Sequence, residues 1–293
     1  MNGPLNARAP AVADTIAPWP APAKLNLFLH VTGRRSDGYH SLQTVFQFID
    51  LCDYLVFEPR AAGIRRTNPL PGVDPDQDLT VRAARLLQRH AGIDRGADIT
   101  LDKRIPLGGG LGGGSSDAAT TLWVLNRLWG LDYSIDTLAD LGLRLGADVP
   151  VFVRGRAAWA EGIGEILTPL DLGTAWYAVV VPGVEVRTAD VFADPDLTRR
   201  AKAFTIAGFL SGDQGVNDCE PIVRRRYPEV AQALDWLGVR AAARMSGTGS
   251  AVFASFANRA TAAAALKGLP EGWRGYVCRG LNRSPLMDRL DVH

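Results

Sequence analysis

The sequence predicts two α+β domains that meet near residue 165. The chain has 293 residues, about two domains of ordinary length. Strand-like alternation of apolar residues is interspersed with segments whose apolar residues recur every three or four positions, as in helices. The hydrophobic fraction is 47% and the charged fraction is 22%, close to the averages for soluble globular proteins. Each half can therefore bury a core of its own.

Residues 1–21 are predicted to form a flexible tail, because the first 22 residues hold five prolines and six alanines. They lack the uninterrupted apolar segment of a secretory signal. No apolar stretch of the chain approaches the roughly 20 residues needed to span a bilayer. Cys52, Cys219 and Cys278 show no CxxC spacing, which indicates reduced, buried thiols. We expect a cytoplasmic protein without membrane association.

The N-terminal domain, residues 22–165, is expected to begin with strands. Leucines alternate with other residues in "KLNLFLHVTG", which predicts a strand with one packed face. An Asp-Gly turn follows. Residues 42–59 predict two more strands, broken near Asp50. Residues 60–78 are dense in Pro, Gly, Asn and Asp and are predicted to be largely loop.

A helix is predicted over residues 79–92, with Gly92 as its C-cap. Residues 97–106 predict a strand near a sheet edge, because two basic residues interrupt it. The remaining elements of this domain are helices at about 115–129 and 134–146, followed by "ADVPVFVRG". The C-terminal domain, residues 166–293, should contain a strand at 177–186, helices to about Trp236, a strand region at 243–256, a helix, and a strand at 276–281.

The stretch "PLGGGLGGGSSDAAT" holds six glycines between Gly108 and Gly114 and then two serines. Without side chains, successive backbone N–H groups can point together into a concavity. The helix predicted to begin at about Ser115 adds its positive end and its free N–H groups, which favour an anion. Ser115 and Ser116 add hydroxyl donors. The loop is therefore predicted to bind phosphate.

Other interpretations of this loop fit less well. Gly108, Gly110 and Gly113 formally match a dinucleotide fingerprint, but that motif follows a buried parallel strand, and the residues before this loop are charged. A Walker A loop ends in Gly-Lys-Ser/Thr, which this loop lacks. Protein kinases carry H-R-D and D-F-G motifs, which are also missing. A plain turn needs one or two glycines, not six.

The loop motif resembles the second motif of the GHMP kinases, which include galactokinase and the homoserine, mevalonate and phosphomevalonate kinases. "PAKLNLFLHVTGRRSDGYHSLQTVFQ" resembles the first motif of one branch, the kinases of 4-diphosphocytidyl-2-C-methyl-D-erythritol. "LGADVPVF" and "MSGTGSAVF" resemble its remaining signatures, and the similarity extends from about Pro22 to "NRSPL". The resemblance implies an N-terminal domain like the second domain of ribosomal protein S5 and a ferredoxin-like C-terminal domain.

The same resemblance implies ATP-dependent phosphorylation of the 2-hydroxyl of 4-diphosphocytidyl-2-C-methyl-D-erythritol, a step of the non-mevalonate route to isoprenoid precursors. The catalytic pair falls on Lys24 and Asp148. Asp148 would accept the proton of the attacking hydroxyl, and Lys24 would hold that carboxylate ionised and help polarise the hydroxyl. Both residues adjoin apolar segments and so lie beside the core.

For ATP, the resemblance implies contacts from the glycine loop and from Lys103 near the adenine. The loop residues are Pro106, Leu107, Gly108, Gly109, Gly110, Leu111, Gly112, Gly113, Gly114, Ser115 and Ser116. Ser246 to Ser250 form a second small-residue loop, which either closes over the phosphates or makes a tight strand turn. The family usually has Asn where this chain has Asp78, so the contacts to the adenosine end are in question there.

For the substrate's cytosine, the resemblance implies stacking on Tyr39 and Phe192, with His40 bonding to the edge of the base. Thr188 and Asn26 are matched to further polar substrate contacts. The expected cofactor is ATP with Mg²⁺, whose protein ligands the sequence does not identify.

The expected partner is a small molecule with a cytidine diphosphate group. Net charge is +1 without a long basic run, so nucleic acid is not expected. The protein is expected to be a monomer or a homodimer. The alternatives are a homoserine- or mevalonate-type kinase, or a non-enzymatic nucleotide- or RNA-binding module.

Overall fold

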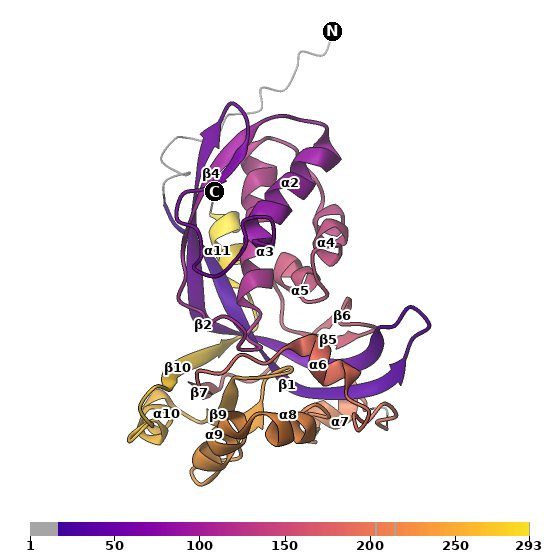
Figure 1. Cartoon of the computed structure of the whole chain (residues 1–293), viewed down its shortest axis with the longest axis vertical. Coiled ribbons are helices and arrows are strands. Elements are labelled where there is room, and N and C mark those ends of the chain that lie inside the picture. Colours follow the sequence, from indigo (N-terminus) through magenta and orange to yellow (C-terminus); the bar gives the residue numbers. More distant parts are fainter. Residues whose placement is uncertain (1–16, 203, 214, 293) are drawn as a thin grey trace.

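A long antiparallel hairpin runs through both halves of the molecule (Figure 1). The computed structural model describes residues 17–202, 204–213 and 215–292. The hairpin consists of β1 (Trp19–Arg34) and β2 (His40–Arg60). β1 is buried from its first residue to Val31, and its side chains contribute in turn to three hydrophobic clusters. This strand therefore holds residues from both halves in fixed relative positions.

The N-terminal half has four helices on one side of the strands around β2 (Figure 1). Its strands are β3 (Ile64–Arg66), β4 (Gly96–Asp102), β5 (Ala158–Glu161) and β6 (Ile166–Pro169). Its helices are α2 (Leu79–Ala91), α3 (Gly113–Leu128), α4 (Ile135–Leu143) and α5 (Val149–Arg154).

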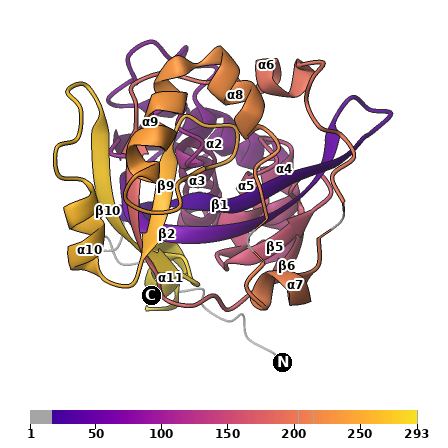
Figure 2. The ribbon, with the colours of Figure 1, turned by 90° about the horizontal axis from the view of Figure 1, so that it is seen from below.

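The C-terminal half places helices around a second group of strands, with α9 beside β9 and α8 beside α9 (Figure 2). Its strands are β7 (Trp176–Val181), β8 (Arg244–Met245), β9 (Val252–Phe256) and β10 (Arg274–Leu281). Its helices are α6 (Thr188–Ala193), α7 (Ile206–Leu210), α8 (Glu220–Arg226), α9 (Pro228–Gly238), α10 (Arg259–Ala265) and α11 (Pro285–Asp291).

One continuous sheet joins the two halves. Its main path has the order β3-β4-β2-β10-β7-β9-β8, with β1 and β5 also paired to β2, and β6 paired to β5. The link is the end of β10, where Gly280 and Leu281 pair with Ile49 and Phe48 of β2. α11 then returns to the N-terminal core, where Leu286 is buried. The boundary near residue 165 stays a prediction; β5 and β6 pair across that position.

Several predicted elements are confirmed. Helix α2 ends at Gly92, whose φ of 64° is left-handed, as expected of a C-cap. Ser134 caps α4 by accepting from the backbone N–H of Thr137. The three cysteines are buried, and burial raises the pKa of Cys52 to about 12. No helix among the described residues is long and apolar enough to cross a membrane.

Other expectations about the first strands were wrong. β1 is buried on both faces instead of one, because it lies between the two halves. It also starts at Trp19, so residues 19–21 belong to this strand and not to the tail; Trp19 is buried in the N-terminal core. Residues 1–16 of the predicted tail lie outside the described residues. β2 is continuous, and the predicted break near Asp50 is a register shift in its pairing with β1.

The region predicted as loop also contains a strand. Residues 64–66 form β3, which pairs in parallel with β4 and takes the edge position expected for residues 97–106. β4 ends at Asp102. Lys103 and Arg104, the basic residues that suggested a strand at the edge of the sheet, therefore lie outside β4. A strand of three residues is too short for its alternation of side chains to be recognised in the sequence.

Candidate active site

An ion pair between Lys24 of the "AKLN" motif and Asp148 of the "GADVP" motif forms the centre of the site. Lys24 Nζ lies 3.2 Å from Asp148 Oδ2; the lysine side chain is 4% exposed and the aspartate side chain 34%. β1 holds Lys24 within the core, and the buried apolar residues of α5 fix Asp148 at the start of that helix. A buried ammonium is thus presented to a carboxylate that remains open to a ligand.

Asn26 and Thr44 hold this lysine in place. Lys24 Nζ donates to Asn26 Oδ1, and Asn26 Nδ2 donates to Thr44 Oγ1 at 3.0 Å. The Thr44 hydroxyl in turn donates to the carbonyl of Phe28. These bonds use both polar atoms of the Asn26 amide, so its orientation is fixed. Thr44 was not among the residues expected from the sequence, because its partner lies on the neighbouring strand.

The glycine loop has the backbone pattern of an anion-binding concavity. Gly108, Gly110 and Gly112 have φ values of 65°, 70° and 73°, and the residues between them do not have positive φ. Alternation of left-handed and ordinary backbone turns successive N–H groups toward one point. Helix α3 begins at Gly113, two residues before the expected start, and its first N–H groups have no partner within the helix.

The carbonyl oxygens of residues 108–111 face the protein, where they accept hydrogen bonds from the second small-residue loop and from β1. In a trans peptide the following N–H points the opposite way, so the N–H groups of residues 109–112 point away from these donors. The donors to residues 108, 109, 110 and 111 are Ser250 N at 3.3 Å, Ala251 N at 3.0 Å, Ser246 Oγ at 3.1 Å and Lys24 N at 2.9 Å.

Lys103 lies behind the loop between two aspartates. Its Nζ donates to Asp53 Oδ2 at 2.5 Å and to Asp117 Oδ2 at 2.7 Å. Burial raises the pKa of Asp117 to about 7, although Lys103 opposes this effect. Neither aspartate was expected from the sequence. The presence of Asp in the "GSSDAA" segment was the one available signal, since a charge is unusual there in a buried helix turn.

Asp78 has structural contacts that explain why a charged residue stands at this position. It caps α2 by accepting from Thr80 N at 2.8 Å, and it forms a buried ion pair with Arg66 Nη1 at 2.8 Å. Arg66 belongs to β3, the strand that was not expected. The carboxylate at this position is therefore neutralised by a neighbouring cation.

The residues that the resemblance matches to base recognition lie at the turn that joins β1 to β2 and on α6. Tyr39 is 59% exposed. His40 stacks on Phe192 of α6, with ring centroids 5.2 Å apart and an interplanar angle of 22°. Arg199 Nε donates to His40 Nε2 at 3.2 Å. Burial, together with Arg199 and Arg34, lowers the pKa of His40 below its ordinary value.

Thr188 joins this region to the second small-residue loop, because its hydroxyl lies 2.9 Å from that of Thr248. Arg199 was not expected from the sequence: it lies in an irregular segment with no motif. The structure thus brings Lys24, Asn26 and Asp148 together beside the glycine loop, and it groups His40 with Phe192 at a separate end.

Comparison with known proteins gives the family. The family model described as "GHMP kinases N terminal domain" matches residues 78–156. The model described as "GHMP kinases C terminal" matches residues 196–275. A 4-diphosphocytidyl-2-C-methyl-D-erythritol kinase from Nitrosococcus oceani is 57% identical over 93% of this chain and 98% of its own length. One from Alkalilimnicola ehrlichii is 59% identical over 93% of this chain and 94% of its own. The chain belongs to the GHMP kinases.

Solved structures of GHMP kinases share the fold. A crystal structure of 4-(cytidine 5'-diphospho)-2C-methyl-D-erythritol kinase matches with a TM-score of 0.76 and 36% identity, over 90% of this chain and 99% of that one. Homoserine kinase from Cytophaga hutchinsonii matches with a TM-score of 0.70 at 19% identity, over 95% of this chain and 98% of that one. The predicted GHMP kinase fold, with two α+β domains, is confirmed.

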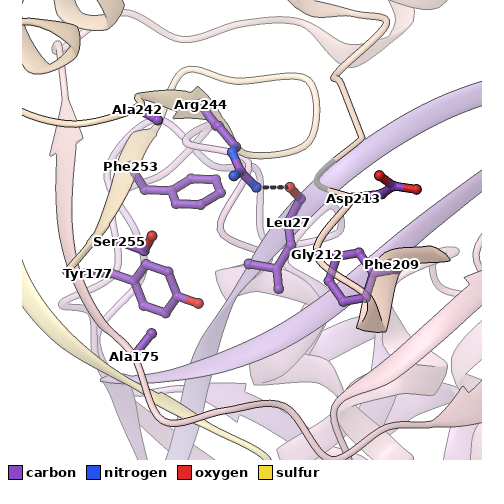
Figure 3. Close-up of a pocket in the computed structure, with 10 residues that line it drawn as sticks. All are labelled: Leu27, Ala175, Tyr177, Phe209, Gly212, Asp213, Ala242, Arg244, Phe253 and Ser255. Carbon is purple, nitrogen blue, oxygen red and sulfur yellow. Dashed lines mark hydrogen bonds between the residues drawn. The ribbon is translucent and has the colours of Figure 1, made fainter. Parts of the chain in front are cut away.

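This GHMP kinase also has a cavity of about 240 Å³ behind β1, outside the site (Figure 3). Aromatic side chains form much of its wall, and Arg244 donates to the carbonyl of Leu27 at 3.1 Å. None of the expected site residues lines it. Among the described residues, no three His, Cys, Asp or Glu side chains lie together in an arrangement that could hold a metal ion.

Proposed function

We propose that this chain transfers the γ-phosphoryl group of ATP to the 2-hydroxyl of 4-diphosphocytidyl-2-C-methyl-D-erythritol. It would thereby serve the non-mevalonate route to isoprenoid precursors in the cytoplasm. The observation that carries this proposal is the Lys24–Asp148 ion pair beside a glycine loop with alternating backbone conformation. The names of relatives that are 54–59% identical over most of the chain support the choice of substrate.

Phosphoryl transfer asks a protein mainly for positioning and charge stabilisation. Asp148 would accept the proton of the attacking hydroxyl, a contribution of about 10²–10⁴-fold. Lys24 would hold that carboxylate in place and place a positive charge beside the reacting oxygen. The N–H groups of residues 109–112 and the start of α3 would bind the ATP phosphates.

The base end supports a cytidine nucleotide as the substrate. Tyr39 and Phe192 would stack on the cytosine, His40 would bond to its edge, and Thr188 would make a further polar contact, whereas Asn26 would contact the substrate beside Lys24, at the other end. His40 stacks on one face of the Phe192 ring, so the base would take the other face of that ring. Homoserine and mevalonate have no base to stack, so this region favours the cytidine substrate over those of the other GHMP kinases.

Mg²⁺ would enter the site with ATP. In kinases this ion is held largely by phosphate oxygens, water and one or two carboxylates. The open carboxylate of Asp148 and the loop serines are chemically suited to lie near such a complex, and the ion would supply neutralisation of phosphate charge. Its protein ligands, like the oligomeric state, are left open by this proposal.

The test is a coupled ADP-release assay with 4-diphosphocytidyl-2-C-methyl-D-erythritol, homoserine and mevalonate in parallel. We expect turnover with the first substrate only. Turnover with homoserine or mevalonate alone would favour the other kinase types. ATP binding without turnover of any polyol would favour a nucleotide-binding module.

A further inference from the structure

Three charged side chains behind the glycine loop have no part in the proposed chemistry. Asp53 comes from β2, Lys103 follows β4, and Asp117 lies early in α3. Both carboxylates bond to the Lys103 ammonium, at 2.5 Å and 2.7 Å. The side chains of Asp53 and Asp117 are 0% and 3% exposed, and that of Lys103 is 12% exposed. One buried cation is therefore shared by two buried carboxyl groups from different elements.

These residues hold the loop at both of its ends. Asp53 Oδ1 accepts from the backbone N–H groups of Arg104 at 2.6 Å and Ile105 at 2.7 Å, just before the loop. At the other end, a Cβ atom on Gly113 would lie 2.9 Å from Lys103 Nζ. The ammonium therefore lies close beside the first residue of α3, and it bonds to Asp117 one turn further along that helix. The segment between these ends consists mainly of glycines, which cannot anchor themselves through side chains.

We propose that Asp53, Lys103 and Asp117 form a positioning triad that fixes the phosphate-binding loop and the start of α3 for ATP. The inference rests on the proposed function, since it takes the glycine loop as the ATP site. It also changes the role expected of Lys103. The family resemblance implies a contact near the adenine, whereas the triad acts on ATP through the loop.

The charges of the triad depend on one another. Burial lowers the pKa of Lys103, but the two aspartates outweigh this effect and raise its pKa above the ordinary value. If Lys103 is removed, two buried carboxyl groups face each other without a cation, and the pKa of Asp117, already raised to about 7, rises further, so that at pH 8 this carboxyl has to take up a proton for the loop to keep its place. Removing one partner of a buried ion pair is strongly unfavourable, because it leaves an uncompensated charge. The loop should then shift to let water reach the carboxylates.

The test compares three variants of the full chain: Lys103→Met, Asp117→Ala, and the double variant Lys103→Met/Asp117→Asn. Calorimetry gives the Kd for ATP, and steady-state kinetics give KM for ATP and for the cytidine substrate separately. We expect Lys103→Met to raise Kd and KM for ATP by about tenfold or more. KM for the cytidine substrate should stay within about threefold of wild type, because Tyr39 and Phe192 lie at the other end of the site.

The double variant separates positioning from direct contact. If Lys103 acts through the triad, a neutral amide at Asp117 relieves the repulsion, and the double variant should bind ATP about threefold or more tighter than Lys103→Met. If Lys103 contacts ATP itself, the added change cannot restore that contact. Affinity equal to or below that of Lys103→Met would then overturn the proposal. Lys267→Met, at an exposed position, is the matched control and should match wild type.

Asp117→Ala covers the case in which Lys103→Met does not fold, as judged by urea unfolding. Asp117 is buried beneath the loop, so a direct-contact role for Lys103 predicts little change in this variant. The triad predicts a rise in KM for ATP of about fivefold or more, and an unchanged value would contradict it. Absence of turnover by wild type would contradict the proposed function alone, because the calorimetric Kd for ATP still tests the triad.

Discussion

The phosphate end and the base end of the candidate site are built in different ways. At the phosphate end, Lys24 and Asn26 are buried, and the glycine loop is bonded to a second loop and to β1. At the base end, Tyr39 is mostly exposed, and His40 is held by one ring contact and one bond from Arg199. The first region has its geometry set before a ligand binds. The second leaves a face open to a ligand.

This difference corresponds to what each end has to do. Misplacing a reacting group by about 1 Å can cost about 10²-fold in rate, so a fixed scaffold benefits the phosphate end. Base stacking tolerates small displacements and depends mainly on a free aromatic face. Changes at the phosphate end should therefore alter kcat, ATP binding or stability. Changes at the base end should alter KM for the cytidine substrate.

The largest expected effect is that of Asp148→Asn. The amide keeps the shape of the side chain but cannot accept a proton, so kcat should fall by about 10²-fold or more with ATP binding retained. The side chain is one-third exposed and makes no cap bond to α5, so folding should be unaffected. Steady-state kinetics and calorimetry check both points, with Asp140→Asn on the exposed face of α4 as control. Near-normal kcat would remove Asp148 from the role of base.

The next effect concerns how tightly the two loops are fitted together. A Cβ atom on Gly110 would lie 2.4 Å from Ser246 O and 2.8 Å from Gly249 O, at a φ of 70°. The collision is with protein backbone, so Gly110→Ala should lower the free energy of unfolding by about 1–3 kcal/mol and also raise KM for ATP. Urea unfolding gives the first quantity.

Gly109→Ala is the matched control, because φ is not positive there and the nearest atoms to its Cβ would be 3.6–3.8 Å away. Its stability should stay within about 0.5 kcal/mol of wild type. Equal destabilisation by both variants would show that the loop, as a whole, does not tolerate side chains. A selective loss of ATP affinity in Gly109→Ala would instead place that Cβ against the phosphates.

At the base end, Tyr39→Ala or Phe192→Ala should raise KM for the cytidine substrate about 5- to 150-fold. This range follows from a stacking contribution of about 1–3 kcal/mol per base. kcat and KM for ATP should change little, because neither ring is near the Lys24–Asp148 pair. Leu210→Ala, at another exposed apolar side chain, serves as the control. A fall in kcat with KM unchanged would contradict the separation of the two ends.

The two ends also differ in how much of them the sequence predicts. Lys24, Asp148 and the glycine loop belong to contiguous motifs, so their residue types and spacing can be recognised directly. Thr44 and Asp53 hold those motifs from distant positions, and only strand pairing determines which residues become neighbours. Arg199 lies in an irregular segment and Arg66 in a three-residue strand, where no periodic pattern exists. Burial of both faces of β1 likewise depends on the C-terminal half.

The smallest expected effect is on discrimination between bases, and it tests His40 alone. Because its pKa is lowered, the ring is neutral at pH 7 and above, and its Nε2 accepts from Arg199. A neutral ring with Nε2 as acceptor carries its proton on Nδ1, which can donate to a base. Cytosine offers an acceptor at N3, whereas uracil has an N–H there. One neutral hydrogen bond contributes about 0.5–1.5 kcal/mol, so His40→Ala should reduce the preference for the cytidine substrate over its uridine analogue by about 2- to 13-fold.

The aromatic variants should leave that ratio closer to wild type, since stacking does not distinguish the two bases. If His40 only closes the hairpin turn, His40→Ala should lower stability and leave the ratio of kcat/KM values unchanged. Measuring both analogues on the folded variant separates these roles.

Acid pH provides a second check in the wild-type enzyme. Because the folded-state pKa lies below the ordinary value, the neutral ring and its Arg199 bond persist above about pH 6.5. They are lost as pH falls through the lowered pKa, and the preference for the cytidine substrate should decline over that same interval.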